Sequence, residues 1–184
     1  MKTFLKERQG FTLIEVIISM VIFIIILSLS TVNHRQGEHA STFRLQALNI
    51  EDSIRSVQNM SLTGKEIAGV IPNAYGIFFD DDGRTFIIYG DDGDNLFDES
   101  KDVIYSEMSL DSGVELYGYN LFCDGVFLSN TLDIVFIPPR PTVIINNTLA
   151  CSNSVIFVKS SNSDGKWEVH FDAVSGRTWT EFSE

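Results

Sequence analysis

The chain has 184 residues and a formal net charge of −12, from 13 lysines and arginines against 25 aspartates and glutamates. This length suits one domain of ordinary size with an appended segment. The acidic balance argues against nucleic acid as the main partner of the folded part, because phosphate binding needs Lys and Arg.

The chain begins with a short basic segment that precedes a long apolar run. Lys2, Lys6 and Arg8 lie before residues 11–32, a run of 22 residues in which Glu15 is the only charged side chain. A helix over this run would extend about 33 Å, enough to cross the hydrocarbon core of a bilayer. Basic residues before a membrane span hold the N-terminus in the cytoplasm, so we expect the rest of the chain outside it.

Three interpretations of the apolar run compete. A secretory signal peptide would use Ser28-Leu29-Ser30 as its small-x-small cleavage site, but the run is long for such a peptide and contains Glu15. A plain membrane anchor has no reason to contain a carboxylate, which costs about 2.5–3.5 kcal/mol near the bilayer centre and less near its edge. The third interpretation gives Glu15 a function, as a charge within a membrane span usually has.

The segment Gly10-Phe11-Thr12-Leu13-Ile14-Glu15, followed by the unbroken apolar run, resembles the N-terminal signal of type IV pilins and type II secretion pseudopilins. The resemblance implies that a membrane prepilin peptidase cuts between Gly10 and Phe11 and then methylates the new N-terminus on Phe11. It also implies that Glu15 is the assembly glutamate, which neutralises the Phe11 ammonium of a neighbouring subunit. Breaking such a pair in a dry helix bundle leaves an unpaired buried charge, at a cost of about 3–5 kcal/mol.

A second helical half is predicted after the apolar run, over residues 33–64. Its apolar side chains recur at spacings of three and four residues, which predicts a single apolar face that packs against the sheet that follows. Gly64 is the predicted C-terminal stop. The apolar positions are Ala40, Phe43, Ala47, Ile50, Ile54 and Val57.

From Ala74 onward the sequence changes to short β-branched and aromatic runs separated by turn residues, which is typical of strands. Hairpin turns are predicted at 163–166 and 174–178, and the prolines within 138–141 should interrupt the sheet. One helix followed by antiparallel strands predicts an α+β fold. The layout resembles a minor pilin, in which a long N-terminal helix packs on an antiparallel β-sheet head. The predicted strands are 75–79, 85–89, 114–117, 132–137, 154–158 and 167–171.

An acidic segment follows the second predicted strand. Asp92, Asp94 and Asp98, with the carbonyl group of Leu96, alternate as the ligands of a calcium loop do, and Glu99 or Asp102 would complete the shell. Counted from Asp92, however, the segment lacks the Gly at position six and the Glu at position twelve of such a loop. A solvated acidic turn is the alternative, and no other cofactor is expected.

The two cysteines, Cys123 and Cys151, do not form a C-x-x-C pair, which argues against zinc. A disulfide between them is expected if the domain lies outside the cytoplasm, and two separate buried thiols are the alternative. The three histidines, His34, His39 and His170, are scattered, and the chain has no nucleophile–base motif and no phosphate loop. No catalytic residues are therefore predicted.

These patterns divide the chain into a leader (1–10), a transmembrane and filament-core helix half (11–32), an amphipathic helix half (33–64) and an extracytoplasmic β-rich head (65–184). The resemblance implies a non-enzymatic structural subunit, a minor pilin or pseudopilin, of a type IV pilus, a competence pilus or a type II secretion pseudopilus. Its expected partners are other pilin subunits, the prepilin peptidase and, during biogenesis, the inner membrane. An uncleaved, membrane-anchored extracytoplasmic module that binds a ligand or an ion is the alternative.

Overall fold

The computed structural model describes residues 12–123, 126–140, 142–149, 151–160 and 165–183, with the backbone alone for 29–40 and 126–128. The chain divides into two compact units, Met1–Ser41 and Thr42–Glu184, and each is described by itself. Cleavage at Gly10 and methylation of Phe11 therefore concern residues outside the described part of the chain.

One helix, α1 (Leu13–Thr63), opens the described chain. Its apolar side chains from Leu13 to Leu27 are all at least 46% exposed. Over the residues that the structure describes, no helix has the combined length and apolarity needed to cross a membrane, and the transmembrane segment stays a prediction. At the other end of α1, Gly64 has a positive φ of 63° and the Lys65 N–H donates to the Met60 carbonyl oxygen. This is the glycine stop expected at the end of a helix.

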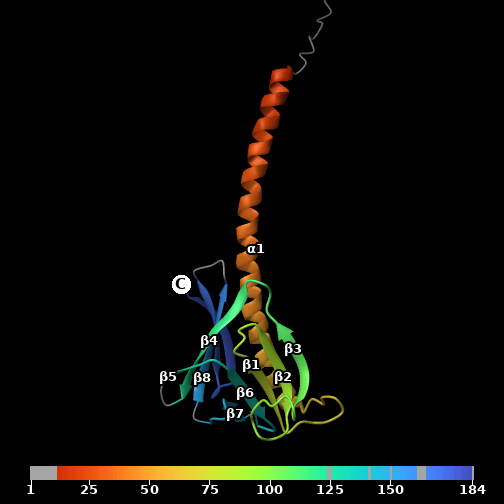
Figure 1. Cartoon of the computed structure of the whole chain (residues 1–184), viewed down its shortest axis with the longest axis vertical. Coiled ribbons are helices and arrows are strands. Elements are labelled where there is room, and N and C mark those ends of the chain that lie inside the picture. Colours follow the sequence, from red (N-terminus) through yellow and green to blue (C-terminus); the bar gives the residue numbers. More distant parts are fainter. Residues whose placement is uncertain (1–11, 124–125, 141, 150, 161–164, 184) are drawn as a thin grey trace, which may run out of the picture. The chain divides into compact units, whose positions relative to one another are not determined.

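In the described part of the chain, ten strands form two five-stranded antiparallel sheets (Figure 1). The strand order is β3-β2-β1-β6-β7 in the first sheet and β10-β9-β8-β4-β5 in the second. One helix followed by antiparallel sheets confirms the predicted α+β class. The strands are β1 (Ala74–Phe79), β2 (Thr85–Asp91), β3 (Val103–Ser109), β4 (Val114–Cys123), β5 (Val126–Ser129), β6 (Leu132–Ile137), β7 (Thr142–Ile145), β8 (Cys151–Ser160), β9 (Lys166–Asp172) and β10 (Arg177–Ser183).

Six of these strands were predicted, and the four that were not are β3, β5, β7 and β10. Two of those four, β3 and β10, expose side chains along much of their length, and β5 and β7 have only four residues each. All four lie at the edges of the sheets: β3 and β7 in the first sheet, and β5 and β10 in the second. The sequences of β3 and β10 mix polar and apolar residues, and β5 and β7 are too short for an apolar period to be recognised.

The part of α1 in the second unit and both sheets share one hydrophobic core. The predicted apolar face of the helix is confirmed at Phe43, Ala47, Ile50, Ile54 and Val57, which are all buried. The sheets contribute large buried side chains to the same core, among them Tyr75, Ile77, Phe79, Leu132, Phe136 and Phe171. A second, smaller cluster lies on the other face of the first sheet, with Phe97 from the β2–β3 loop packed against it.

A disulfide joins Cys123 at the end of β4 to Cys151 at the start of β8. The two residues are direct partners in the antiparallel register of these strands. The alternative of two separate buried thiols is not what the structure contains. The bridge spans 28 residues of sequence. A loop of this size contributes about 3–4 kcal/mol of stability in the chain-entropy account.

Candidate functional site

The N-terminus of α1 is a capping box built from Thr12 and Glu15. The Glu15 N–H donates to Thr12 Oγ1 at 3.4 Å, and the Thr12 N–H donates to Glu15 Oε2 at 3.3 Å. The two residues thereby satisfy two of the backbone groups that a helix start leaves unpaired. This cap was not among the predicted features, although the Ser/Thr-x-x-Glu spacing is its sequence signal. Glu15 thus has a local partner within the single chain.

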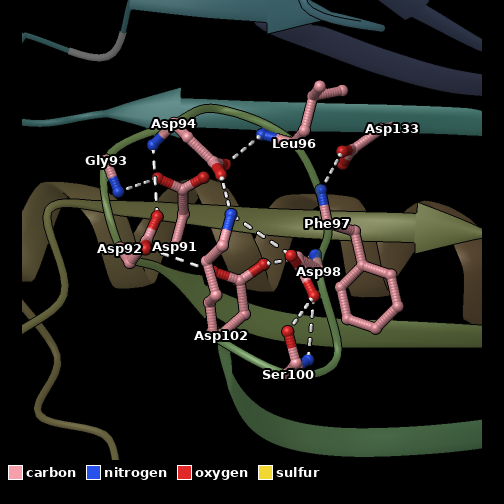
Figure 2. A network of polar contacts seen from close by, with 11 residues as sticks. Asp91, Asp92, Gly93, Asp94, Leu96, Phe97, Asp98, Ser100, Asp102 and Asp133 are labelled. Atoms are coloured by element: carbon pink, nitrogen blue, oxygen red, sulfur yellow. Dashed lines mark hydrogen bonds and ion pairs between the residues drawn. The ribbon is translucent and has the colours of Figure 1, made fainter.

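The acidic segment is the β2–β3 loop, which follows Asp91 and ends at Asp102 (Figure 2). Phe97 anchors the loop to the outer face of the first sheet. Its ring stacks on Phe78 at a centroid distance of 4.8 Å and lies 5.0 Å from the Tyr89 ring. The aromatic anchor removes apolar surface from water and fixes the middle of the loop.

Asp133 on β6 ties the same loop to the sheet. The Tyr89 hydroxyl donates to Asp133 Oδ1 at 2.7 Å, and the Phe97 N–H donates to Oδ2 at 2.9 Å. Asp133 is only 3% exposed. Because burial disfavours the charged carboxylate, it raises the pKa of Asp133 to about 7, although both hydrogen bonds oppose the shift.

Gly76 on β1 makes room for this contact. It lies opposite Tyr89 in the sheet register, and a Cβ atom added to Gly76 would lie 2.1 Å from Cζ of the Tyr89 ring. The absence of a side chain therefore lets the tyrosine ring lie across β1 and reach Asp133 on β6.

Two of the four predicted calcium ligands face a lysine. Lys101 Nζ lies 3.0 Å from Asp94 Oδ2 and 3.2 Å from Asp98 Oδ2. Hydrogen bonds from Ser100, followed by the contact with Lys101, lower the pKa of Asp98 to about 2. The contact with Lys101 and the Leu96 N–H lower the pKa of Asp94. The ammonium group here supplies the positive charge that a bound ion was expected to provide.

The predicted set otherwise forms turns. The Asp94 N–H donates to Asp92 Oδ1 at 3.3 Å, and the Leu96 N–H donates to Asp94 Oδ1 at 3.1 Å. These are Asx turns, in which an aspartate binds the backbone two residues later. Asp92 and Asp94 thus act as turn acceptors, and calcium binding by Asp92, Asp94, Leu96 and Asp98 stays a prediction.

A different acidic group lies at the base of the loop. Asp91, Asp92 and Asp102 bring carboxylate oxygens within 4.8 Å of one another. Asp91 is 1% exposed; its Oδ1 accepts the Gly93 N–H at 2.6 Å, while Oδ2 is buried without a hydrogen-bond partner. Burial raises the pKa of both Asp91 and Asp102. The structure thus brings Asp92 together with Asp102 and with Asp91, which ends a buried strand and was not predicted as a ligand.

The pKa shifts predict that the chain becomes less stable as pH rises from about 4 to about 7. Asp133 keeps its proton to about pH 7 in the folded state, whereas an unfolded aspartate loses it near pH 4. The folded state therefore binds more protons in this window, and raising the pH favours unfolding. The buried Asp91 and Asp102 act in the same direction, while the lowered pKa values of Asp94 and Asp98 act below the window.

Denaturant unfolding in chelator at pH 5 and pH 8 measures this dependence. We expect a larger unfolding free energy at pH 5, and a smaller difference between the two pH values for Asp133→Asn. Equal unfolding free energies for the unsubstituted chain would contradict the assignment of a raised pKa to Asp133.

Comparison with known proteins identifies the N-terminal segment. Residues 5–31 match the family model of the prokaryotic N-terminal methylation motif. This motif is the hallmark of type IV pilins and pseudopilins, and the predicted resemblance is thereby confirmed. Proteins of that kind are structural and not enzymatic, and their motif implies membrane anchoring and assembly with other subunits. No curated protein and no solved structure matches the chain.

Proposed function

We propose that this chain is a structural, non-enzymatic subunit, a minor pilin or pseudopilin, that assembles through its N-terminal helix into a type IV pilus, a competence pilus or a type II secretion pseudopilus. The observation that carries the proposal is the methylation motif over residues 5–31, which runs into the helix that begins at Leu13. The second unit, Thr42–Glu184, has a core of its own, and its β-rich part, residues 65–184, serves as the head.

The exposed apolar surface of the helix supports assembly. Among the residues that the structure describes, the large apolar side chains from Leu13 to Leu27 are at least 46% exposed. An apolar surface of this extent needs lipid or other helices around it. We therefore propose that the inner membrane surrounds residues 11–32 before assembly and that neighbouring subunits surround them in the filament.

The disulfide supports an extracytoplasmic position of the head. Cys123 and Cys151 are bridged, and such bonds persist in oxidising compartments and are rare in the reducing cytoplasm. The head, residues 65–184, accordingly lies outside the cytoplasm, while the leader, residues 1–10, meets the prepilin peptidase at the cytoplasmic face. Removal of the leader frees the Phe11 ammonium for the Glu15 carboxylate of a neighbouring subunit.

Deletion of the prepilin peptidase from the producing cells tests this proposal. We expect the chain in the sheared filament or pseudopilus fraction of cells that have the peptidase, and only in the membrane fraction of cells that lack it. An uncleaved anchor would stay in the membrane fraction in both strains, and that distribution would reject the proposal in favour of the anchored binding module.

A second role is favoured by the unpaired buried oxygen of Asp91. We propose that calcium binds at the base of the acidic loop, where Asp91, Asp92 and Asp102 converge. Calcium prefers oxygen ligands and tolerates irregular geometry, so a loop with three carboxylates offers suitable donors. The ion would neutralise two carboxylates that burial otherwise disfavours and would hold the loop against the sheet.

Thermal unfolding of the full chain in detergent tests calcium binding. Extracellular modules bind calcium at roughly 10⁻⁴–10⁻³ M, and a hundredfold excess over Kd stabilises by about 2.7 kcal/mol. We therefore expect a higher melting temperature in millimolar calcium than in chelator. Asp91→Asn should abolish the difference, whereas Asp94→Asn should keep it, because Asp94 faces Lys101.

The opposite pattern, loss with Asp94→Asn and retention with Asp91→Asn, would assign the ion to the ligand set of Asp92, Asp94, Leu96 and Asp98. A melting temperature that does not respond to calcium would leave a solvated acidic turn.

A further inference from the structure

Two adjacent strands of the second sheet place an imidazole beside two carboxylates. Glu168 and His170 lie two residues apart on β9, so their side chains leave the same face of the strand. Glu181 on β10 is the direct register partner of Glu168. One ligand atom from each of the three side chains lies within 4.8 Å of the other two. We propose that Glu168, His170 and Glu181 form a binding site for a divalent transition metal ion, with zinc as the best-matched ion.

The site lies on the face of the sheet that is turned away from the hydrophobic core. Val169 and Phe171, which alternate with Glu168 and His170 along β9, are buried in the core. Alternation along a strand then directs the three candidate ligands to the opposite face. Glu181 is exposed, so an ion has access from solvent and a water molecule would complete its coordination.

The two glutamates need a cation between them. Like charges placed directly opposite each other on neighbouring strands destabilise a sheet. Lys166 Nζ lies 3.0 Å from Glu168 Oε1, which accounts for one oxygen of one carboxylate. Within the described chain, Glu181 makes no ion pair. A metal ion would neutralise both carboxylates at once.

His170 has a ring nitrogen available for metal coordination. His170 Nε2 is buried without a hydrogen-bond partner, and it lies 3.4 Å from Glu168 Oε2. Two ligands that are each about 2.0–2.1 Å from a tetrahedral zinc ion are separated by about 3.4 Å. The His170 ring also stacks on Trp179, with centroids 4.9 Å apart and planes 4° apart, which fixes the direction of the ring nitrogens. This spacing and this fixed ring suit one shared ion.

The donor set selects the class of metal. An imidazole nitrogen with carboxylate oxygens suits zinc and related transition ions, whereas calcium takes oxygen ligands alone. The site is thus chemically distinct from the acidic loop, and it does not depend on filament assembly. No cysteine is among its ligands, so the lack of a C-x-x-C pair has no bearing on zinc binding here.

Metal titration of the full chain in detergent, free of other divalent ions, tests the site. Zinc should bind at one equivalent by calorimetry, and cobalt at the same site should show the visible absorption of a tetrahedral complex. Loss of even an outer partner of a metal ligand weakens binding roughly 10–100-fold. We therefore expect His170→Gln and Glu181→Gln to weaken zinc binding by at least as much, and Lys166→Met to strengthen it by removing the competing ammonium group.

Two controls keep the test decisive. Glu107→Gln, which alters an exposed carboxylate on β3, should leave zinc affinity unchanged, and Asp91→Asn should do the same if the acidic loop is not involved. Glu181 is exposed, so its substitution should not disturb folding, which circular dichroism would verify. Absence of zinc binding, or binding that survives both His170→Gln and Glu181→Gln, would overturn the proposal and leave an ordinary His170–Glu168 contact.

Discussion

Replacement of Glu15 by Val should leave the precursor cleaved and inserted in the membrane but should largely exclude it from filaments. Without the carboxylate, the Phe11 ammonium of the neighbouring subunit is left unpaired in the helix bundle. An unpaired buried charge costs about 3–5 kcal/mol, which corresponds to a loss of about two to four orders of magnitude in the equilibrium for incorporation. Quantitative immunoblotting of sheared filaments against the membrane pool measures the ratio.

The capping box at the start of α1 supplies matched controls for this prediction. Glu15→Gln removes the charge but retains a side chain that can close a capping box. Thr12→Ala removes the Oγ1 atom that accepts the Glu15 N–H, at a cost of about 1 kcal/mol, but keeps the charge. If Glu15 pairs with a neighbour, Glu15→Gln should be excluded like Glu15→Val while Thr12→Ala assembles. Exclusion of Thr12→Ala with normal incorporation of Glu15→Gln would show that Glu15 acts as a helix cap instead.

Gly76→Ala should destabilise the head by about 3–5 kcal/mol, from overpacking and from the loss of the buried hydrogen bond between Tyr89 and Asp133. The new Cβ would lie 2.1 Å from the Tyr89 ring, which is fully buried and cannot move without leaving Asp133. Displacement of the tyrosine would also release Phe97 from its contact with the Tyr89 ring, so the acidic loop should loosen. Denaturant unfolding gives the free energy, and hydrogen exchange of the Phe97 amide reports on the loop.

A double-mutant cycle with Tyr89→Ala separates the clash from any general effect of alanine in a strand. When the tyrosine ring is absent, Gly76→Ala should cost less than about 1 kcal/mol, because the clash is gone. The stability effects of residues in contact are not additive, whereas those of independent residues are. An equal cost of Gly76→Ala in both backgrounds would show that the Tyr89 contact does not explain the glycine.

Much of the fold followed from the sequence because its strongest elements have strong periodicity. The buried face from Phe43 to Val57 has apolar residues at helical spacing. The buried strands β1 and β6 are short runs that are mostly apolar. The edge strand β3, by contrast, exposes Ile104 and Tyr105 and alternates weakly. The division into two sheets depends on long-range pairing, such as that of β1 with β6, which no local pattern encodes.

The candidate sites show the same division between local and long-range information. The motif from Gly10 to Glu15 is contiguous, so the sequence alone revealed it. The acidic loop was predicted at the right place in the sequence. The partners of its side chains depend on the conformation of its turns, and the pairing of Lys101 with Asp94 and Asp98 was not predicted. Asp133 lies far along the chain on β6, and only the sheet register brings it beneath the loop.

Cleavage after Gly10 can be measured from the intact mass and N-terminal sequence of the chain purified from membranes. We expect a mature chain that begins at Phe11 and carries one methyl group on its amino terminus. Its formal net charge should be −14, compared with −12 for the precursor, because cleavage of the leader takes away three basic residues and one acidic residue. A chain that still begins at Met1, or one that begins at Thr31 after a signal-peptide cut, would contradict processing as a pilin.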